Sequence, residues 1–309
     1  MNEVIRDFVG YGRAQPQFDW PGGTRLALSL VVNYEEGGEN CVLNGDPCSE
    51  TLNSDVIGAQ PRPGSRNLAV ESHYEYGSRV GHWRILDLLR ECNIPATYFA
   101  VSSALEKHPE AARSISEEGH EVVSHGARWI DYDSVDCETE DDHIIQSLDV
   151  LERLCGVRPV GWYTGRVSPN TRALVQKHGL LYDCDAYNDD LPYWTRTNNS
   201  PHLVVPYSFD CNDMRFASAP GFNTPDDFIG FMLLSDEASL ASHPMLAGLG
   251  GAFYPLAIIP LWSDGLTGAD PANLSRQRRL VESLGGTFHH VVGDDVPAAL
   301  LDFARAENA

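Results

Sequence analysis

The sequence predicts an α/β fold, a distorted (β/α) barrel of seven or eight parallel strands. Apolar runs of strand length alternate along the chain with segments of helical periodicity, which is the order of a parallel sheet with crossover helices. The runs are nearly continuous rather than alternating, as in strands that are buried on both faces. The length of 309 residues fits one barrel of this type, and 42% apolar with 21% charged residues is an ordinary globular composition.

The individual elements follow from these patterns in chain order. The first strand is expected at 26–34, where LALSLVVNY is almost entirely apolar. Further strands are expected at 96–101, 121–126, 160–165, 180–186, 203–209, 256–262 and 287–292. Helices are expected at 76–92, 108–118, 141–155, 170–178, 226–234, 273–284 and 296–306. Gly119 and Gly156 are suitable C-terminal stops for two of these helices, and Asn170 is a suitable N-cap for another.

Charge and cysteine content exclude several classes of function. The 44 acidic and 22 basic residues give a net charge of −22, which repels phosphate backbones and anionic lipid, so we expect neither nucleic-acid nor membrane partners. No apolar run approaches the roughly 18 residues that a membrane span needs, and no signal-peptide core is visible, so we expect a soluble, cytoplasmic protein. The seven cysteines form no CxxC pair, and free thiols are expected.

Polar side chains stand where four of the predicted strands end, and in a parallel barrel these ends meet at one rim. They are Glu35, Glu36 and Glu39 after the first strand, His125 after the third, Tyr163 and Arg166 after the fourth, and Asp183 at the end of the fifth. Taken singly, each fits a structural role, such as a solvated acidic loop, a core histidine or a loop ion pair. Their common position predicts a shared active site.

The residue types at this rim suit general acid–base chemistry. A carboxylate crowded by two others resists ionisation, so its pKa rises toward neutral. Arg166 can hold one carboxylate ionised, and His125 can donate to an oxyanion or shuttle a proton. No GxSxG nucleophile motif and no phosphate-binding GxGxxG or GxxxxGK[ST] motif is present. The attack of water on a carbonyl is the simplest reaction for these groups.

Long ordered strings in the sequence resemble the polysaccharide deacetylase family, and within it the bacterial metal-independent allantoinase subgroup. The strings are ESHYEYGSR at 71–79, NYEEGGE at 33–39, SHGARWIDY at 124–132, GWYTGR at 161–166, LYDCD at 181–185 and DDLPYW at 189–194. The resemblance covers about residues 5–230. It implies one deacetylase-like barrel domain over 1–309, with 1–24 as an N-terminal arm and 235–309 as a divergent C-terminal part.

The resemblance also implies roles for single residues. Metal-dependent members carry two aspartates after strand one and a His-x-x-x-His pair after strand three; here Glu35, Glu36, His125 and Trp129 stand at those positions. An indole cannot ligate a metal, so we expect no metal and no other cofactor. Glu35 is then the expected base, with Arg166 as its orienting partner.

The subgroup hydrolyses the ring of allantoin to allantoate, which implies a small cyclic amide substrate and a role in purine catabolism. Carbonyl polarisation would fall to His125 and Arg166. The residues expected to bind the substrate are Glu36, Glu39, Trp129, Tyr163 and Asp183. A homo-oligomer is expected, a tetramer by resemblance.

The C-terminal part departs from the family pattern, which leaves alternatives open. Members usually carry a histidine at the end of the seventh strand, where this chain has Leu261 and Trp262; His243 or Asp264 could replace it. Three functions therefore remain: a metal-independent cyclic amide hydrolase, a metal-dependent N-deacetylase, or a non-hydrolytic isomerase, cyclase or binding protein. The loop 41–63 is a candidate lid or subunit contact.

Overall fold

A computed structural model describes residues 6–14, 16, 29–52, 54, 56, 58–189, 191–197, 200–209, 212–217, 221–225 and 227–228. The chain divides into two compact units, Met1–Ile5 with Ser29–Ser208, and Arg6–Leu28 with Phe209–Ala309. The larger part of the first unit contains every element that is discussed below. Several predicted features lie outside the described residues: the strands at 256–262 and 287–292, the later helices, His243, Asp264, most of 1–24 and all of 235–309. The single-domain assignment therefore stays a prediction.

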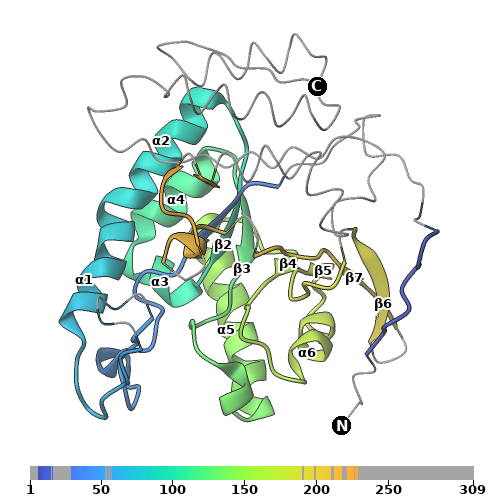
Figure 1. The fold of residues 1–309 in the computed structure, drawn as a ribbon, viewed down its shortest axis with the longest axis horizontal. Coiled ribbons are helices and arrows are strands. Elements are labelled where there is room, and N and C mark those ends of the chain that lie inside the picture. The colour runs from blue at the N-terminus through green and yellow to red at the C-terminus, as the bar shows by residue number, and fades with distance from the viewer. Residues whose placement is uncertain are drawn as a thin grey trace. The chain divides into compact units, whose positions relative to one another are not determined.

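A seven-stranded sheet forms the centre of the first unit (Figure 1). Its strands are β1 Val31–Tyr34, β2 Thr97–Ala100, β3 Glu121–Ser124, β4 Gly161–Trp162, β5 Tyr182–Asp183, β6 Tyr193–Thr197 and β7 Ser200–Val204. Their order is β1-β2-β3-β4-β5-β7-β6, and within the described residues the sheet is open at β1 and β6. All neighbours are parallel except β6 and β7, so the α/β class and the parallel core of the sheet are confirmed.

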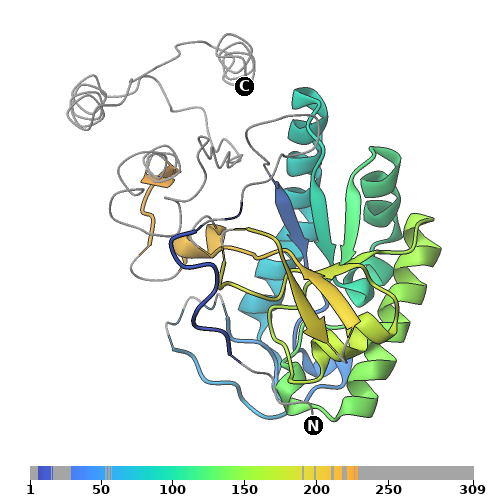
Figure 2. The same ribbon diagram turned by 90° about the vertical axis from the view of Figure 1, so that its right-hand side faces the viewer.

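Helices follow the strands as predicted, with differences at the start of α5, which begins four residues earlier than expected, and at two further places. They are α1 Leu68–Tyr76, α2 His82–Cys92, α3 Ser102–Lys107, α4 Pro109–Glu117, α5 Cys137–Cys155 and α6 Thr171–Lys177. The helical segment expected at 76–92 begins at Leu68, and a π-helical turn, Gly77–Gly81, joins its two halves. The short α3 was not expected. Figures 1 and 2 show α2, α4 and α5 alongside the strands.

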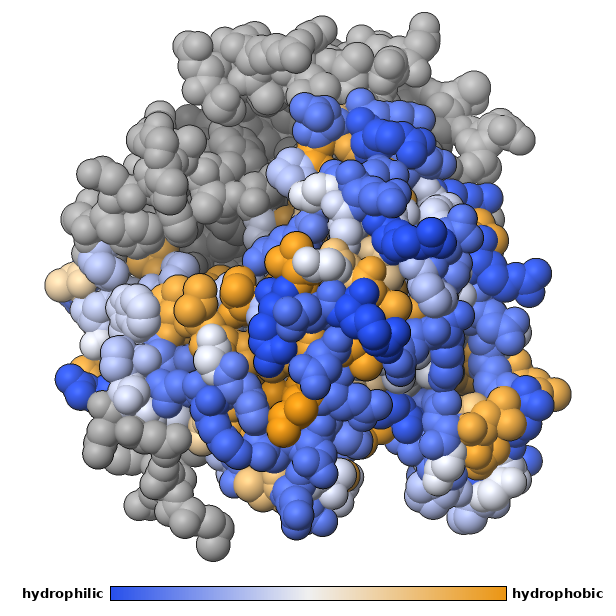
Figure 3. Space-filling view, turned by 180° about the vertical axis from the view of Figure 1, so that it is seen from behind, coloured by the Kyte–Doolittle hydropathy of each residue, from blue (hydrophilic) through white to orange (hydrophobic). Residues whose placement is uncertain are grey.

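Local signals explain where the longest helix, α5, begins and ends. The Asp136 side chain accepts a hydrogen bond from the backbone N–H of Thr139 at 2.8 Å, which satisfies one of the free donors of the first turn. At the other end Gly156 adopts a left-handed conformation with φ of 74°, as its predicted role as a stop requires. No helix among the described residues has the length and apolar character needed to cross a membrane. Hydrophilic side chains predominate on the described part of the face in Figure 3.

The register of the parallel strands places one residue from each strand in a single row. The row consists of Tyr34, Ala100, Ser124, Trp162, Asp183 and Val204. Its side chains point toward the helices: the Ser124 hydroxyl lies 2.7 Å from that of Ser147 in α5, and Trp162 packs in a cluster with Ile144. Because side chains alternate along a strand, the next residue of each strand faces the opposite side, here called the inner face.

Two buried clusters fill the two sides of the sheet. The helix side holds Ile144, Leu148, Trp162, Leu174, Val175 and Leu180, and the inner face holds Phe99, Val123, Tyr163 and Cys184. The six described cysteines are all free thiols, as expected for them. The inner cluster lies beneath the ends of the strands and so supports the residues that follow them.

The helix-side cluster predicts different costs for two neighbouring isoleucines of α5. Ile144 is fully buried, whereas Ile145 is 40% exposed. Ile144→Ala should lower the free energy of unfolding by about 2–5 kcal/mol because it leaves a cavity, and Ile145→Ala should cost less than about 1 kcal/mol. Urea denaturation followed by circular dichroism measures both values. Equal losses for the two variants would contradict the assignment of the helix-side core.

Candidate active site

Glu35 and His125 form the central contact of the predicted rim. Each follows the register row by one residue, on β1 and β3, and both therefore reach the inner face. The Oε1 atom of Glu35 lies 3.1 Å from Nε2 of His125, whose ring is 1% exposed. The other ring nitrogen, Nδ1, lies 2.7 Å from the backbone carbonyl oxygen of Tyr163.

These two contacts determine how protons are distributed. A carbonyl oxygen can only accept, so Nδ1 of His125 must carry a hydrogen and donate it to Tyr163. In the neutral ring, Nε2 is then without a proton and faces Glu35. The contact needs one proton, held either by the carboxyl group or by an imidazolium. The Glu35–His125 pair therefore shares a single proton that can cross between its two members.

Aromatic rings of the inner face hold His125 in place. The imidazole centroid lies 5.1 Å from that of Tyr163 and 6.3 Å from that of Phe99. Tyr163 is 5% exposed, and its hydroxyl lies 3.0 Å from that of Tyr187. The ring of Tyr163 is packed in the inner cluster and its carbonyl group orients the histidine, while the substrate contact expected for Tyr163 stays a prediction.

Arg166 lies at the rim, where it contacts Trp129 and Glu50. The guanidinium carbon stands 3.6 Å from the ring centroid of Trp129, a stacked cation–π geometry. Its Nη1 atom lies 3.4 Å from Oε2 of Glu50, which belongs to the loop 41–63. The Glu35 carboxylate contacts His125, so the orienting role of Arg166 toward Glu35 stays a prediction. The pairing with Glu50 joins distant segments and leaves no local sequence pattern.

The carboxyl group of Glu50 is ionised where it faces Arg166. Burial favours its neutral form, but backbone N–H groups of Leu52 and Thr51 and the charge of Arg166 outweigh it and lower the pKa of the Glu50 carboxyl. A full negative charge thus faces the guanidinium. The loop 41–63 thus places Glu50 at the rim. The role as a lid or subunit contact that was expected for this loop stays a prediction.

Tyr74 of α1 is a rim residue that the sequence reasoning did not single out. Its ring centroid lies 6.3 Å from that of Trp129, and the residue is buried. Burial raises the pKa of its phenol, and the charges of Glu35 and Glu50 raise it further. The hydroxyl therefore keeps its proton beside the carboxylates. The signal that could have identified it was its position inside the string ESHYEYGSR.

Glu36 and Glu39 are both engaged with the backbone of their own loop. The Oε2 atom of Glu36 accepts the backbone N–H of Glu35 at 2.9 Å. Burial raises the pKa of Glu36 to about 7, and the charges of Glu35 and Glu39, the crowding that the sequence suggested, add a smaller part. Glu39 is 5% exposed and accepts the N–H of Gly37 at 2.6 Å. The substrate contacts expected for both residues stay predictions.

Asp183 lies on the other side of the sheet from the Glu35–His125 pair. It belongs to the register row, so its carboxylate faces the helix side, where Arg172 donates to it at 2.7 and 2.9 Å and His202 lies at 3.0 Å. Burial opposes ionisation, but these two partners lower the pKa of the Asp183 carboxyl. With 1% exposure, Asp183 joins β5 to α6 and β7, and the substrate contact expected for it stays a prediction.

Asp185, two residues further on, is a better rim candidate. It accepts backbone N–H groups of Thr164 at 3.0 Å and Gly165 at 2.7 Å, and so holds the loop that carries Arg166. Burial raises the pKa of Asp185 to about 7, the charge of Asp183 adds to this, and a positive charge on His125 lowers it. Sequence reasoning named Asp183 and not Asp185 as the site residue, because the phase of a two-residue strand is not visible in the sequence.

A metal site would need several His, Cys, Asp or Glu side chains close together at the rim. Within the described residues, no three His, Cys, Asp or Glu side chains come together as a possible cation site. Trp129 occupies the position where the resemblance expects a second histidine, and its ring supports Arg166 instead. The rim among the described residues thus offers hydrogen-bonding groups from Glu35, His125 and Arg166.

Comparison with known proteins gives full-length matches. The chain is 44% identical to PuuE allantoinase in a solved structure, with 91% of each chain covered and a TM-score of 0.74. It is 41% identical to a Schizosaccharomyces pombe protein classed as a polysaccharide deacetylase, over 81% of this chain and 88% of that one. A segment of 46 residues, 15% of this chain, is 63% identical to 5% of the sensor protein KdpD of Mycobacterium tuberculosis.

The family pattern agrees with these matches. The pattern described as "Polysaccharide deacetylase" fits residues 67–182, which include α1 to α6 and three parallel strands. That stretch contains His125, Trp129 and Arg166, the rim residues after β3 and β4. The chain belongs to the polysaccharide deacetylase family.

Proposed function

We propose that this protein hydrolyses a carbon–nitrogen bond of a small cyclic amide, of the allantoin, hydantoin or cyclic imide type, and does so without a metal. The observation that carries the proposal is the Glu35–His125 pair, a base and a proton carrier 3.1 Å apart. Similarity to PuuE allantoinase and to deacetylases supports a hydrolase of carbon–nitrogen bonds. Trp129, in place of a metal-binding histidine, supports metal independence.

The shared proton of the pair allows a closed cycle. With the proton on His125, the Glu35 carboxylate takes a proton from water as the water oxygen bonds to the ring carbonyl carbon. The Nε2–H of His125 then protonates the ring nitrogen as its bond to that carbon breaks. Glu35 now holds a proton and His125 has lost one. Transfer across the 3.1 Å contact restores the starting state.

His125 in this cycle performs the acid step that other family members assign to a strand-seven histidine. A separate acid at His243 or Asp264 is then not needed for leaving-group protonation. Arg166 adds a planar cation, held on the face of Trp129 and by Glu50, that can polarise the carbonyl group. The substrate ring would lie beside Trp129 and Tyr74, which are 6.3 Å apart.

Removal of the base should abolish turnover without loss of the fold. Glu35→Gln keeps the shape of the side chain but cannot take a proton, so kcat on the best cyclic amide should fall about 10²–10⁴-fold while KM changes little. Steady-state kinetics measures both. The control is Glu138→Gln, which removes an exposed carboxylate of α5 and should leave the kinetics unchanged. Full activity of the Glu35 variant would reject the assignment.

Metal independence has its own test. Purified protein should contain far less than one equivalent of any transition metal by plasma mass spectrometry, and excess EDTA should not slow the hydrolysis of allantoin, hydantoin or succinimide. Loss of activity in chelator, with recovery on adding zinc, would show a metal-dependent deacetylase-type enzyme. Tight binding of these compounds without turnover of any would show a non-hydrolytic protein.

A further inference from the structure

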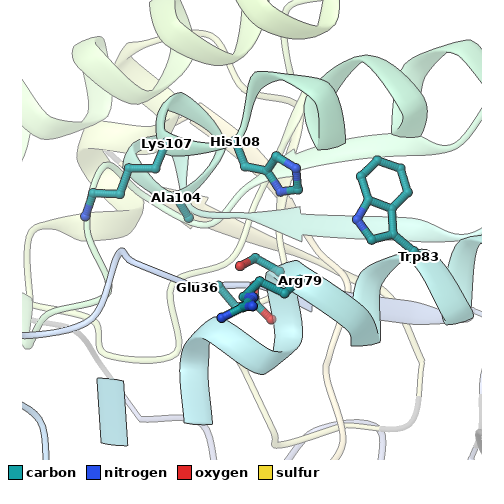
Figure 4. A pocket seen from close by; sticks show the side chains of 7 residues that line it. Glu36, Arg79, Trp83, Ala104, Lys107 and His108 are labelled. Carbon is teal, nitrogen blue, oxygen red and sulfur yellow. The ribbon is translucent and has the colours of Figure 1, made fainter. Parts of the chain in front are cut away.

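A cavity of about 380 Å³ lies apart from the Glu35–His125 pair. Its polar and aromatic lining comprises Glu36, Ser78, Arg79, Trp83, Lys107 and His108. Figure 4 shows that these side chains come from the loop after β1, from the π-helical turn with the start of α2, and from the end of α3. The volume lies in the range of small-molecule sites. Neither Glu35 nor His125 lines it.

The π-helical turn Gly77–Gly81 shapes one wall of the cavity. Such turns are rare and frequently occur at functional sites. Gly77 has an ordinary helical φ of −57°, so its backbone does not require glycine. A Cβ atom there would, however, overlap the Oε1 atom of Glu36, whereas at Gly81 the nearest atom would be 3.9 Å away. Glycine at 77 therefore makes room for the Glu36 carboxyl group in the cavity.

The lining is rich in hydrogen-bond donors. Arg79 is 75% exposed at the mouth, and its ion pair with Glu75 is a loose 3.7 Å. The Lys107 ammonium donates to the carbonyl group of Gly37 and to Asn44 Oδ1, the latter at 2.8 Å, which leaves it one further N–H. Arg79 and the imidazole of His108 are therefore the main donors that the lining offers to an anion.

His108 completes the donor set. Its Nδ1 lies 2.9 Å from the hydroxyl of Tyr34, and burial raises the pKa of that phenol, so the hydroxyl keeps a proton to donate. When Tyr34 donates to Nδ1, the ring hydrogen of His108 is on Nε2. The ring also packs edge-on against Trp83, with centroids 5.6 Å apart, which gives the cavity an aromatic wall.

We propose that this cavity is a second binding site that takes a small oxyanion, a carboxylate or a phosphate, with Arg79 and His108 as its donors. Glu36 separates it from the active site: one oxygen of Glu36 accepts the backbone N–H of the catalytic Glu35, and its carboxyl group lines the cavity. An anion in the cavity lies one side chain away from the base. The site does not depend on the proposed hydrolysis, because binding can be measured without turnover.

Isothermal titration calorimetry of the full-length protein with inorganic phosphate, and separately with succinate, tests the site. At least one should bind, and the one that binds identifies the anionic group. Arg79→Ala should weaken that binding about tenfold or more because a charge-assisted hydrogen bond is lost. Arg84→Ala removes the same charge from α2, but this arginine donates to the Tyr76 hydroxyl at 3.1 Å and does not line the cavity. Its affinity should stay within about twofold of wild type.

Three further variants distinguish a built site from general charge attraction. Glu36→Gln removes the carboxylate of the lining and should tighten binding several-fold. Gly77→Ala displaces the same carboxyl group and should likewise change the affinity, whereas Gly81→Ala should leave it within about twofold of wild type. Absence of binding for both anions, or equal weakening in the Arg79 and Arg84 variants, would overturn the proposal. Circular dichroism of each variant confirms that it is folded.

Discussion

The hydrogen bond from His125 to the carbonyl group of Tyr163 is the constraint on which the rim depends. It spans two neighbouring parallel strands, and it exists because Ser124 and Trp162 pair in register. By fixing a proton on Nδ1, it leaves Nε2 as the nitrogen that meets Glu35. Buried aromatic rings on the inner face keep the imidazole from rotating. Without this contact, the carboxylate would face a ring of undefined tautomer.

Strand alternation sorts the acidic residues of the rim into different roles. Glu35 follows the register row and reaches the inner face, whereas its neighbour Glu36 turns toward the helices. Asp183 belongs to the row, and its carboxylate is bound by Arg172 and His202 on the helix side. Adjacent carboxylates of the same chemical type thus meet different partners because of the side of the sheet that they face.

The parallel strands could be predicted because each is a local run of apolar residues. The proximity of Glu35 and His125 could be predicted because the ends of parallel strands meet at one edge of a sheet. Sequence reasoning failed where a contact joins distant segments without a pattern, as between Arg166 and Glu50. It also failed at β6, a hairpin partner of β7 with polar, exposed positions in YWTRT. For β5, whose ladder contains only two residues, periodicity could not say whether Asp183 or Asp185 would be available.

The stacking of Arg166 on Trp129 has a consequence for how this rim can change over evolutionary time. A histidine at position 129 would offer one more nitrogen donor, but it would also take away the flat platform beneath the guanidinium. A single substitution of Trp129 would therefore remove one of the two contacts that hold Arg166 at the rim.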